Sequence, residues 1–93
     1  MTPLSKQDVE WWTNFRTLLD DQTDFPTDYT FKFIVPLEHM PELQRLLEGY
    51  DLQTRASRNG NYISTTLSPR MESSADVIAV YERVSGVEGL IAL

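Results

Sequence analysis

The sequence of 93 residues contains no cysteine and only one histidine, His39. Without cysteine the chain can form no disulfide, no thiol nucleophile and no cysteine-ligated zinc site, and a single histidine does not make a histidine-based metal site. No apolar run approaches the roughly 20 residues of a membrane-spanning helix. The polar stretch after Met1 also lacks the charged start, apolar middle and small-residue cleavage site of a signal peptide, so we predict a cytoplasmic protein.

Positive charge is also scarce, with 8 Lys and Arg against 14 Asp and Glu and a formal net charge of −6. A negative chain repels phosphate backbones, so general binding to nucleic acid is disfavoured. The acidic residues are concentrated in the first 28 positions, ahead of the segment that forms most of the expected core. The hydrophobic content of 41% and charged content of 24% are ordinary for one globular domain.

The clearest local signal is Asn59-Gly60, which lies between two alternating segments in residues 51–69 and predicts a β-hairpin. A type I′ turn with these two loop residues faces Arg58 with Asn61 and, counted outward, pairs Arg55 with Ser64. The hairpin then has two faces. The expected apolar face holds Leu52, Thr54, Ala56, Ile63, Thr65 and Leu67, and the expected polar face holds Asp51, Gln53, Arg55, Ser57, Tyr62, Ser64, Thr66 and Ser68.

The remaining elements follow from periodicity and from turn residues. Residues 29–35 alternate as a strand that Pro36 ends, and a helix with a poor N-cap is expected from Pro41 to Gly49. A weak capping box at Ser73 begins a helix that stops at Gly86, and residues 87–93 form an apolar run short enough for a strand. The expected buried positions are Phe31, Phe33, Val35, Leu43, Leu46, Leu47, Val77, Val80, Tyr81 and Val84.

An N-terminal helix is predicted from Ser5 to about Asp20, with an apolar stripe of Val9, Trp12, Phe15 and Leu19 that Trp11 and Leu18 widen. The acidic run that follows superficially resembles a calcium loop. Counted from Asp20, however, the glycine and glutamate positions of an EF-hand hold Phe25 and Phe31, so we interpret the run as a solvated linker. The expected division is a helix and acidic linker at 1–24 and a domain at 25–93.

Apart from this first helix, the elements follow one another as strand, helix, strand, strand, helix, strand. Two right-handed strand-helix-strand units that share one sheet give a ferredoxin-like βαββαβ fold of the α+β class. We expect an antiparallel sheet of order 4-1-3-2, with two helices on one face and the N-terminal helix as an addition. Strands 51–57 and 87–93 are the expected edges, and an uncovered edge pairs readily with another chain.

Three segments carry a family resemblance: Phe25-Pro-Thr-Asp-Tyr-Thr-Phe-Lys32, Ser57-Arg-Asn-Gly-Asn-Tyr-Ile-Ser-Thr65, and Val80-Tyr81. In sequence and spacing they resemble the bacterial DUF493, or YbeD-like, family of small uncharacterised proteins over about residues 25–93. The resemblance implies a βαββαβ fold similar to ACT regulatory domains, such as the one appended to phosphoglycerate dehydrogenase. It implies no established biochemical activity.

The loop from Pro36 to Pro41 departs from the ACT domains that bind amino acids, which usually have a glycine there. Without glycine the backbone cannot come as close to a ligand. If the chain senses a small metabolite at this loop, the candidate ligand-binding residues are Lys32, Glu38 and His39.

No catalytic constellation is visible, because His39 lacks a partner that would orient it beside a nucleophile. We therefore predict a protein that is not an enzyme, with no catalytic residue, no metal site and no cofactor. Gly86-Val-Glu-Gly89 has the GxxG spacing of nucleic-acid clamps, but a helix stop followed by a small residue in a strand explains it better.

Two places are candidates for an interaction surface. In the first, Arg55 lies on the sheet face away from the helices, with Tyr62 at the hairpin end and Arg58 beside the hairpin tip. In the second, Trp11 is either at the rim of a packed helix, the favoured interpretation, or exposed with Leu18 as a docking surface. We predict a regulatory or protein-interaction module that forms a homodimer or binds a protein partner, without a membrane. A small-metabolite sensor is the alternative, and RNA binding is weaker than either.

Overall fold

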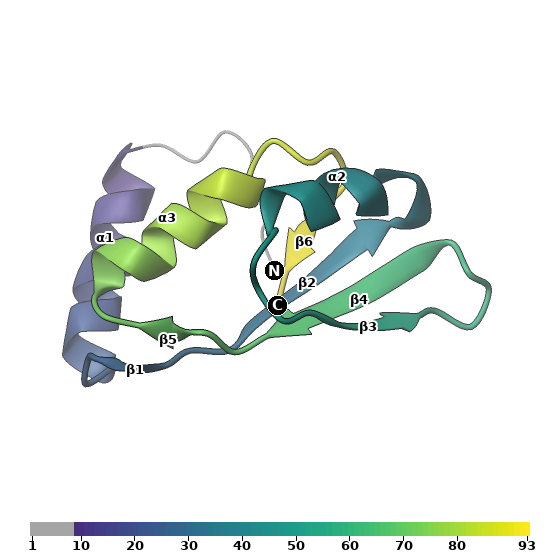
Figure 1. Ribbon diagram of the computed structural model, residues 1–93. Coiled ribbons are helices and arrows are strands. Elements are labelled where there is room, and N and C mark those ends of the chain that lie inside the picture. Colours follow the sequence, from purple (N-terminus) through teal and green to yellow (C-terminus); the bar gives the residue numbers. More distant parts are fainter. Residues whose placement is uncertain (1–8) are drawn as a thin grey trace.

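The computed structural model of the chain describes residues 9–93, which fold into an α+β structure with two antiparallel sheets (Figure 1). The elements in chain order are α1 (Val9–Gln22), β1 (Thr27–Asp28), β2 (Phe31–Pro36), the 3₁₀ helix η1 (Leu37–His39), α2 (Met40–Leu46), β3 (Gln53–Ala56), β4 (Tyr62–Leu67), β5 (Arg70–Met71), α3 (Ser74–Val84) and β6 (Ile91–Ala92). No helix within residues 9–93 combines the length and the apolarity needed to cross a membrane.

The larger sheet has the order β3-β4-β2-β6, so β2 and β4 are central and β3 and β6 are the edges. The central position of these two strands agrees with the prediction. The smaller sheet was not predicted: β1 pairs with β5, and the Tyr29 N–H donates to the Pro69 carbonyl over 3.0 Å. As a result the chain joins the main sheet only at Phe31, two residues later than expected, and β2 includes Pro36.

Strand β2 is buried on one side only. Phe31, Phe33 and Val35 have no exposed surface, whereas Lys32 is exposed and Ile34 is half-buried. Figure 1 shows α2 and α3 on the same face of the four-stranded sheet. Because Phe31, Phe33 and Val35 are completely buried, we infer that their side chains lie on this covered face. The alternation predicted from the sequence is therefore confirmed at every position of this strand that faces the core.

The two covering helices begin as the sequence predicted. No side chain caps α2, and Pro41 occupies its first turn. At α3, the Ser73 Oγ accepts a hydrogen bond from the Asp76 N–H over 3.3 Å, while the Asp76 carboxylate accepts one from the Glu72 N–H over 3.1 Å. The capping box thus has its forward bond, but its return bond reaches one residue further back than the standard motif.

The hairpin has the predicted register and a different turn. Gln53 pairs with Thr66 and Arg55 with Ser64, as expected. The closing pair is nevertheless Ser57 and Tyr62, and the Gly60 N–H donates to the Ser57 carbonyl, so the loop has four residues instead of the two of a type I′ turn. Gly60, the third residue of this loop, takes the left-handed conformation, with φ of 78°.

The prediction of a buried apolar face on the hairpin is correct for β4 and wrong for β3. On β4, Thr65 and Leu67 are buried, but all four residues of β3 are exposed, including Thr54 and Ala56. Helix α2 has only seven residues, and the edge strand gains no burial from it. The outer strand of the sheet is therefore held mainly by its pairing with β4.

The C-terminal strand is shorter than predicted. Only Ile91–Ala92 pair with β2, and the Leu93 N–H adds a bond to the Lys32 carbonyl. Ahead of them the chain turns, with Val87 and Leu90 buried. Gly89 lies in this turn with φ of 76°, and a Cβ built on it would stand 2.8 Å from the Pro36 Cγ. Glycine is therefore required here by backbone conformation and by space, not as a small residue in a strand.

The expected start of the first helix at Ser5 lies outside the described residues. At its other end α1 continues through Gln22, past the predicted stop near Asp20, and the Thr23 N–H still bonds to the Leu19 carbonyl. The expected acidic linker is therefore helical in its first part. Its carboxylates remain exposed to water, which reduces their unfavourable interaction with the helix dipole.

Replacing Gly89 with alanine tests the C-terminal turn. We expect Gly89→Ala to lower the free energy of unfolding by about 2–4 kcal/mol, because a Cβ would both strain the backbone and overlap the Pro36 ring. Gly86→Ala is the matched control, since a Cβ there meets nothing within 4 Å. Urea unfolding checks both, and equal stability of the two variants would contradict this account of the turn.

Candidate interaction surface

One face of the four-stranded sheet carries none of the described helices (Figure 1). The pairing places Lys32, Thr66 and Gln53 in one row across this face, and Ile91, Ile34, Ser64 and Arg55 in the next. Residues directly opposite one another in antiparallel strands point to the same side. We call this surface the helix-free face; it also includes Tyr62, which is 47% exposed.

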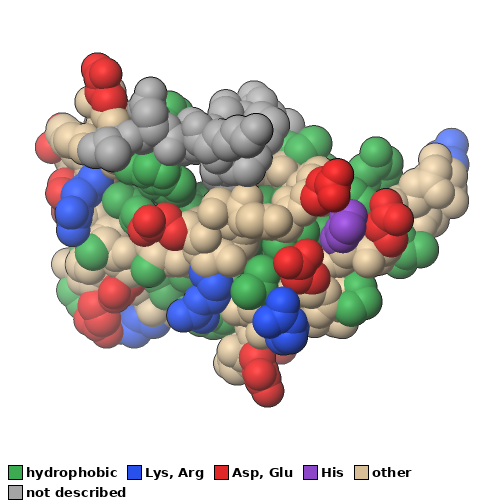
Figure 2. All heavy atoms as spheres, turned by 90° about the horizontal axis from the view of Figure 1, so that it is seen from above, with side chains coloured by type: hydrophobic (Ala, Val, Ile, Leu, Met, Phe, Trp, Pro, Cys, Tyr) green, Lys and Arg blue, Asp and Glu red, His purple; other side chains and the backbone are tan. Residues whose placement is uncertain are grey.

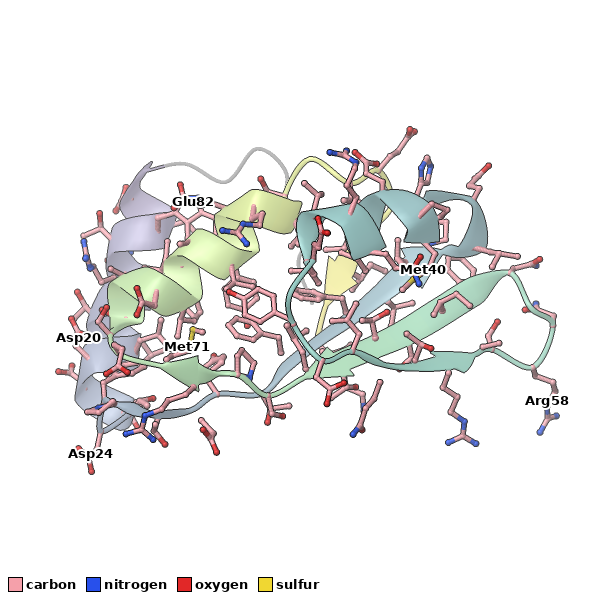
Figure 3. The ribbon with its side chains drawn as sticks, in the orientation of Figure 1. Asp20, Asp24, Met40, Arg58, Met71 and Glu82 are labelled. Atoms are coloured by element: carbon pink, nitrogen blue, oxygen red, sulfur yellow. The ribbon has the colours of Figure 1, made fainter. Side chains whose placement is uncertain are left out.

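Three of the residues predicted for interaction gather at one end of the helix-free face. Arg55, Arg58 and Tyr62 line a shallow depression of about 380 Å³. Figure 3 shows Arg58 projecting outward from the turn that joins β3 and β4. Ile34 contributes an apolar floor, so the depression combines two guanidinium groups, a phenol and aliphatic surface. The remaining lining residues are Ala56, Ser57 and Ser64.

The turn that carries Arg58 is held by a small polar network. The Asn59 Oδ1 accepts hydrogen bonds from the Ser57 hydroxyl over 3.0 Å and from the Asn61 N–H over 3.2 Å. The Ser57 Oγ in turn accepts from the Tyr62 N–H over 3.2 Å. These hydrogen bonds join the two ends of the loop and hold the backbone on either side of Arg58 in place.

The three candidate ligand-binding residues are not brought together. Lys32 lies on the helix-free face beside Thr66, four strand residues or about 13 Å along β2 from Pro36. His39 ends η1 on the far side of that proline, and its Nε2 is 3.9 Å from the Glu38 Oε1. Glu38 lines a separate open depression of about 520 Å³ with Pro36, Leu37, Asn61 and Tyr62.

Trp11 and Leu18 lie on α1, at the opposite end of a molecule that is 39 Å long (Figure 1). Leu18 is 56% exposed, and with Trp11 it borders a depression of about 220 Å³. The inner side of the helix packs on the domain, because Phe15 meets Tyr81 edge to face with ring centroids 5.5 Å apart and Leu19 is buried. The predicted interaction residues thus form two separate surfaces.

Charge is also divided between the ends. Asp20 and Asp24 lie at the α1 end, far from Arg58 at the hairpin tip (Figure 3). Acidic side chains are also spread over the helical side of the molecule (Figure 2). On the helix-free face, Lys32 and Arg55 are the basic residues of the paired strands.

Among residues 9–93, a clearly shifted pKa belongs to a core residue, Tyr81. Burial, together with the neighbouring Tyr29, raises the pKa of Tyr81 well above its usual range. The buried phenol therefore stays protonated and acts as a packing group beneath α1, where Phe15, Phe31 and Phe33 surround it. Within residues 9–93, no group of three or more metal-ligating side chains is placed to hold an ion.

Sequence reasoning missed the contribution of the C-terminal residues to this surface. Ile91 faces Ile34 across the β2–β6 pair, and Leu93 beside it is 53% exposed, which extends the apolar part of the helix-free face. Alternation alone could not assign their side, because the true strand is too short to show a pattern.

The structure defines a class of protein: a small α+β domain whose main antiparallel sheet is covered by helices on one face. The chain belongs to the DUF493 family, described as a protein of unknown function, whose profile matches residues 20–93. The resemblance seen in the sequence is thereby confirmed, and the match begins within the last turn of α1. A UPF0250 protein of Idiomarina loihiensis is 31% identical over 80 residues, covering 78% of this chain and 91% of that protein. No solved structure matches the chain.

Two neighbouring leucines test how α1 is attached. Leu19→Ala should cost about 2–4 kcal/mol of unfolding free energy, because Leu19 is 5% exposed within the core, whereas Leu18→Ala should change stability by about 0.5 kcal/mol or less. Chemical denaturation measures both. If the two variants lose the same stability, α1 does not pack on the domain through Leu19.

Proposed function

We propose that the chain is a cytoplasmic, non-enzymatic regulatory or protein-interaction module, in which residues 25–93 form a ferredoxin-like, ACT-like domain and residues 1–24 an accessory helix and acidic segment. The strand order β3-β4-β2-β6 and the position of α2 and α3 on one face support the fold assignment. Its contacts are made by the helix-free face and by the adjacent edge strand β3.

The observation that carries the proposal is the grouping of Arg55, Arg58 and Tyr62 around an apolar floor on the helix-free face. Arginine and tyrosine are enriched at protein interfaces, where aliphatic stems and rings supply contact area and polar ends supply direction. The cationic groups favour a protein surface that presents carboxylates. The same groups would attract phosphate, but the net charge of −6 opposes the approach of a nucleic acid.

A photo-crosslinking residue on the surface tests this function. With p-benzoylphenylalanine in place of Ser64, on the helix-free face, we expect a discrete protein adduct in producing cells. The same residue in place of Ala79, on the exposed side of α3, should give none. The adduct should disappear when Arg55→Glu and Arg58→Glu are added, because the carboxylate partner is then repelled.

The proposal fails if Ser64 and Ala79 give the same adducts, or if reversing the two arginines leaves the pattern unchanged. The mass of the adduct reports the partner directly. A product of twice the chain's 10.7 kDa indicates a second copy, and any other mass indicates a different protein.

A small-metabolite sensor is the second candidate, favoured by the open depression of about 520 Å³ beside Pro36, Leu37 and Glu38. That volume lies within the range of ligand sites, although the depression is shallow. Titration of labelled protein with pooled amino acids and common metabolites, followed by amide NMR, separates the candidates. Shifts clustered at residues 32–43 would support the sensor, whereas an unchanged spectrum would contradict it for the compounds tested.

A further inference from the structure

The outer edge of β3 is a row of backbone groups that pair with no other described strand. The Ser57 N–H donates to the Tyr62 carbonyl over 2.8 Å, so the backbone of Ser57 points toward β4. In antiparallel strands this direction alternates, so Arg55 and Gln53 also point their backbone groups toward β4. The N–H and C=O groups of Thr54 and its even-numbered neighbours therefore point out from the edge.

The side chains on this edge also alternate. Gln53 and Arg55 lie on the helix-free face, opposite Thr66 and Ser64. Asp51 continues the same series, because it lines one depression with Gln53 and Thr66, while the intervening Leu52 packs toward the core. The exposed edge strand thus carries the acidic Asp51 and the basic Arg55 on the same face, with Gln53 midway between them.

This spacing is self-complementary. When two antiparallel copies of the segment meet at a two-fold axis through Gln53, Asp51 of each copy lies opposite Arg55 of the other. Thr54 then lies opposite Leu52, so the outward backbone groups of both copies meet as hydrogen-bonded pairs. The charged residues fall in the non-hydrogen-bonded pairs, where side chains approach most closely. Isologous contacts of this kind close as a two-fold dimer.

We propose that a second copy of this chain binds at β3, with the two-fold axis at Gln53 and two Asp51–Arg55 ion pairs across it. The proposal deepens the proposed function and rests on it, because it names the partner that supplies the carboxylate. The dimer joins two four-stranded sheets into one of eight strands and makes one continuous helix-free face. Its interface is small, so association is expected to be weak, with a dissociation constant in the micromolar range.

Neighbouring registers are less favourable. An axis at Arg55 would place the two Arg55 side chains opposite each other, and like charges directly opposite are destabilising. An axis at Thr54 would place Arg55 opposite Gln53 and leave Asp51 opposite Ser57, so neither charge gains a partner of opposite sign. Among these three, only the axis at Gln53 pairs both charges of the edge.

Charge exchange tests the ion pairs. Sedimentation equilibrium should give a dimer of the 10.7 kDa chain at high-micromolar concentration. Asp51→Arg and Arg55→Asp should each weaken the dimer about tenfold or more, because two attractive pairs become repulsive. The double variant Asp51→Arg/Arg55→Asp should recover the dimer, since the pairs re-form with exchanged signs. A monomer at high-micromolar concentration, or a double variant no better than the singles, would overturn the proposal.

A new cysteine tests the position of the axis, since the natural chain has no thiol of its own. Gln53→Cys should form a disulfide-linked dimer under mild oxidation, because the two Cβ atoms at the axis lie within disulfide reach. Thr54→Cys is the matched control, since it keeps both charges and its two Cα atoms would be about 8 Å apart in this register. Equal crosslinking of the two variants, or none in Gln53→Cys, contradicts an axis at Gln53.

These results are separate from those for the proposed function. If the chain is monomeric but the Ser64 crosslinker still captures another protein in an arginine-dependent way, the second copy is wrong and the interaction module stands. If the dimer forms through Gln53 but the crosslinker gives no arginine-dependent product, the helix-free face is not the contact surface and only the edge pairing remains.

Discussion

Burial of one side of β2 is the constraint on which the other features depend. Because Phe31, Phe33 and Val35 are completely buried, α2 and α3 must lie on one face, and the register of the central pair with β4 cannot slip by a residue without turning these side chains to water. Both covering helices are thereby committed to the same face. The opposite face keeps Lys32 and Ile34 accessible, so the helix-free face is a direct consequence of how the core is built.

The distribution of charge follows the same division. Asp20 and Asp24 at the α1 end and Arg58 at the hairpin tip lie far apart, so charge is distributed unevenly within the net −6. Net charge governs how easily molecules approach one another, while opposed pairs at close range determine register. Two copies therefore repel at a distance, and ion pairs such as those of Asp51 with Arg55 decide how they fit once in contact.

Local rules predicted the strands and their pairing well, because alternation and a turn residue determine register without knowledge of the rest of the fold. The predicted strand register was correct although the predicted turn type was wrong. A two-residue loop and a four-residue loop that share the same centre pair the same strand residues, such as Arg55 with Ser64. The grouping of Arg55 and Tyr62 followed from this register. Long-range geometry was harder to infer: the length of β2 separates Lys32 from His39, and no local signal revealed the β1–β5 pair or the turn that fits Gly89 against Pro36.

The exposure of β3 connects the local stability of this strand with the binding of a second copy at its free edge. A strand that is exposed at every position and paired on one side has few buried contacts, and such segments open at lower free energy than the core. A second strand on the free edge would satisfy the outward backbone groups of Thr54 and cover part of Leu52, which is only partly buried in the single chain. The core residues of β2 and β4 would be unaffected, because they lie farther into the sheet. The same edge that is least stabilised by the domain is therefore the one that gains most from a partner, and binding there would order β3 without altering the rest of the fold.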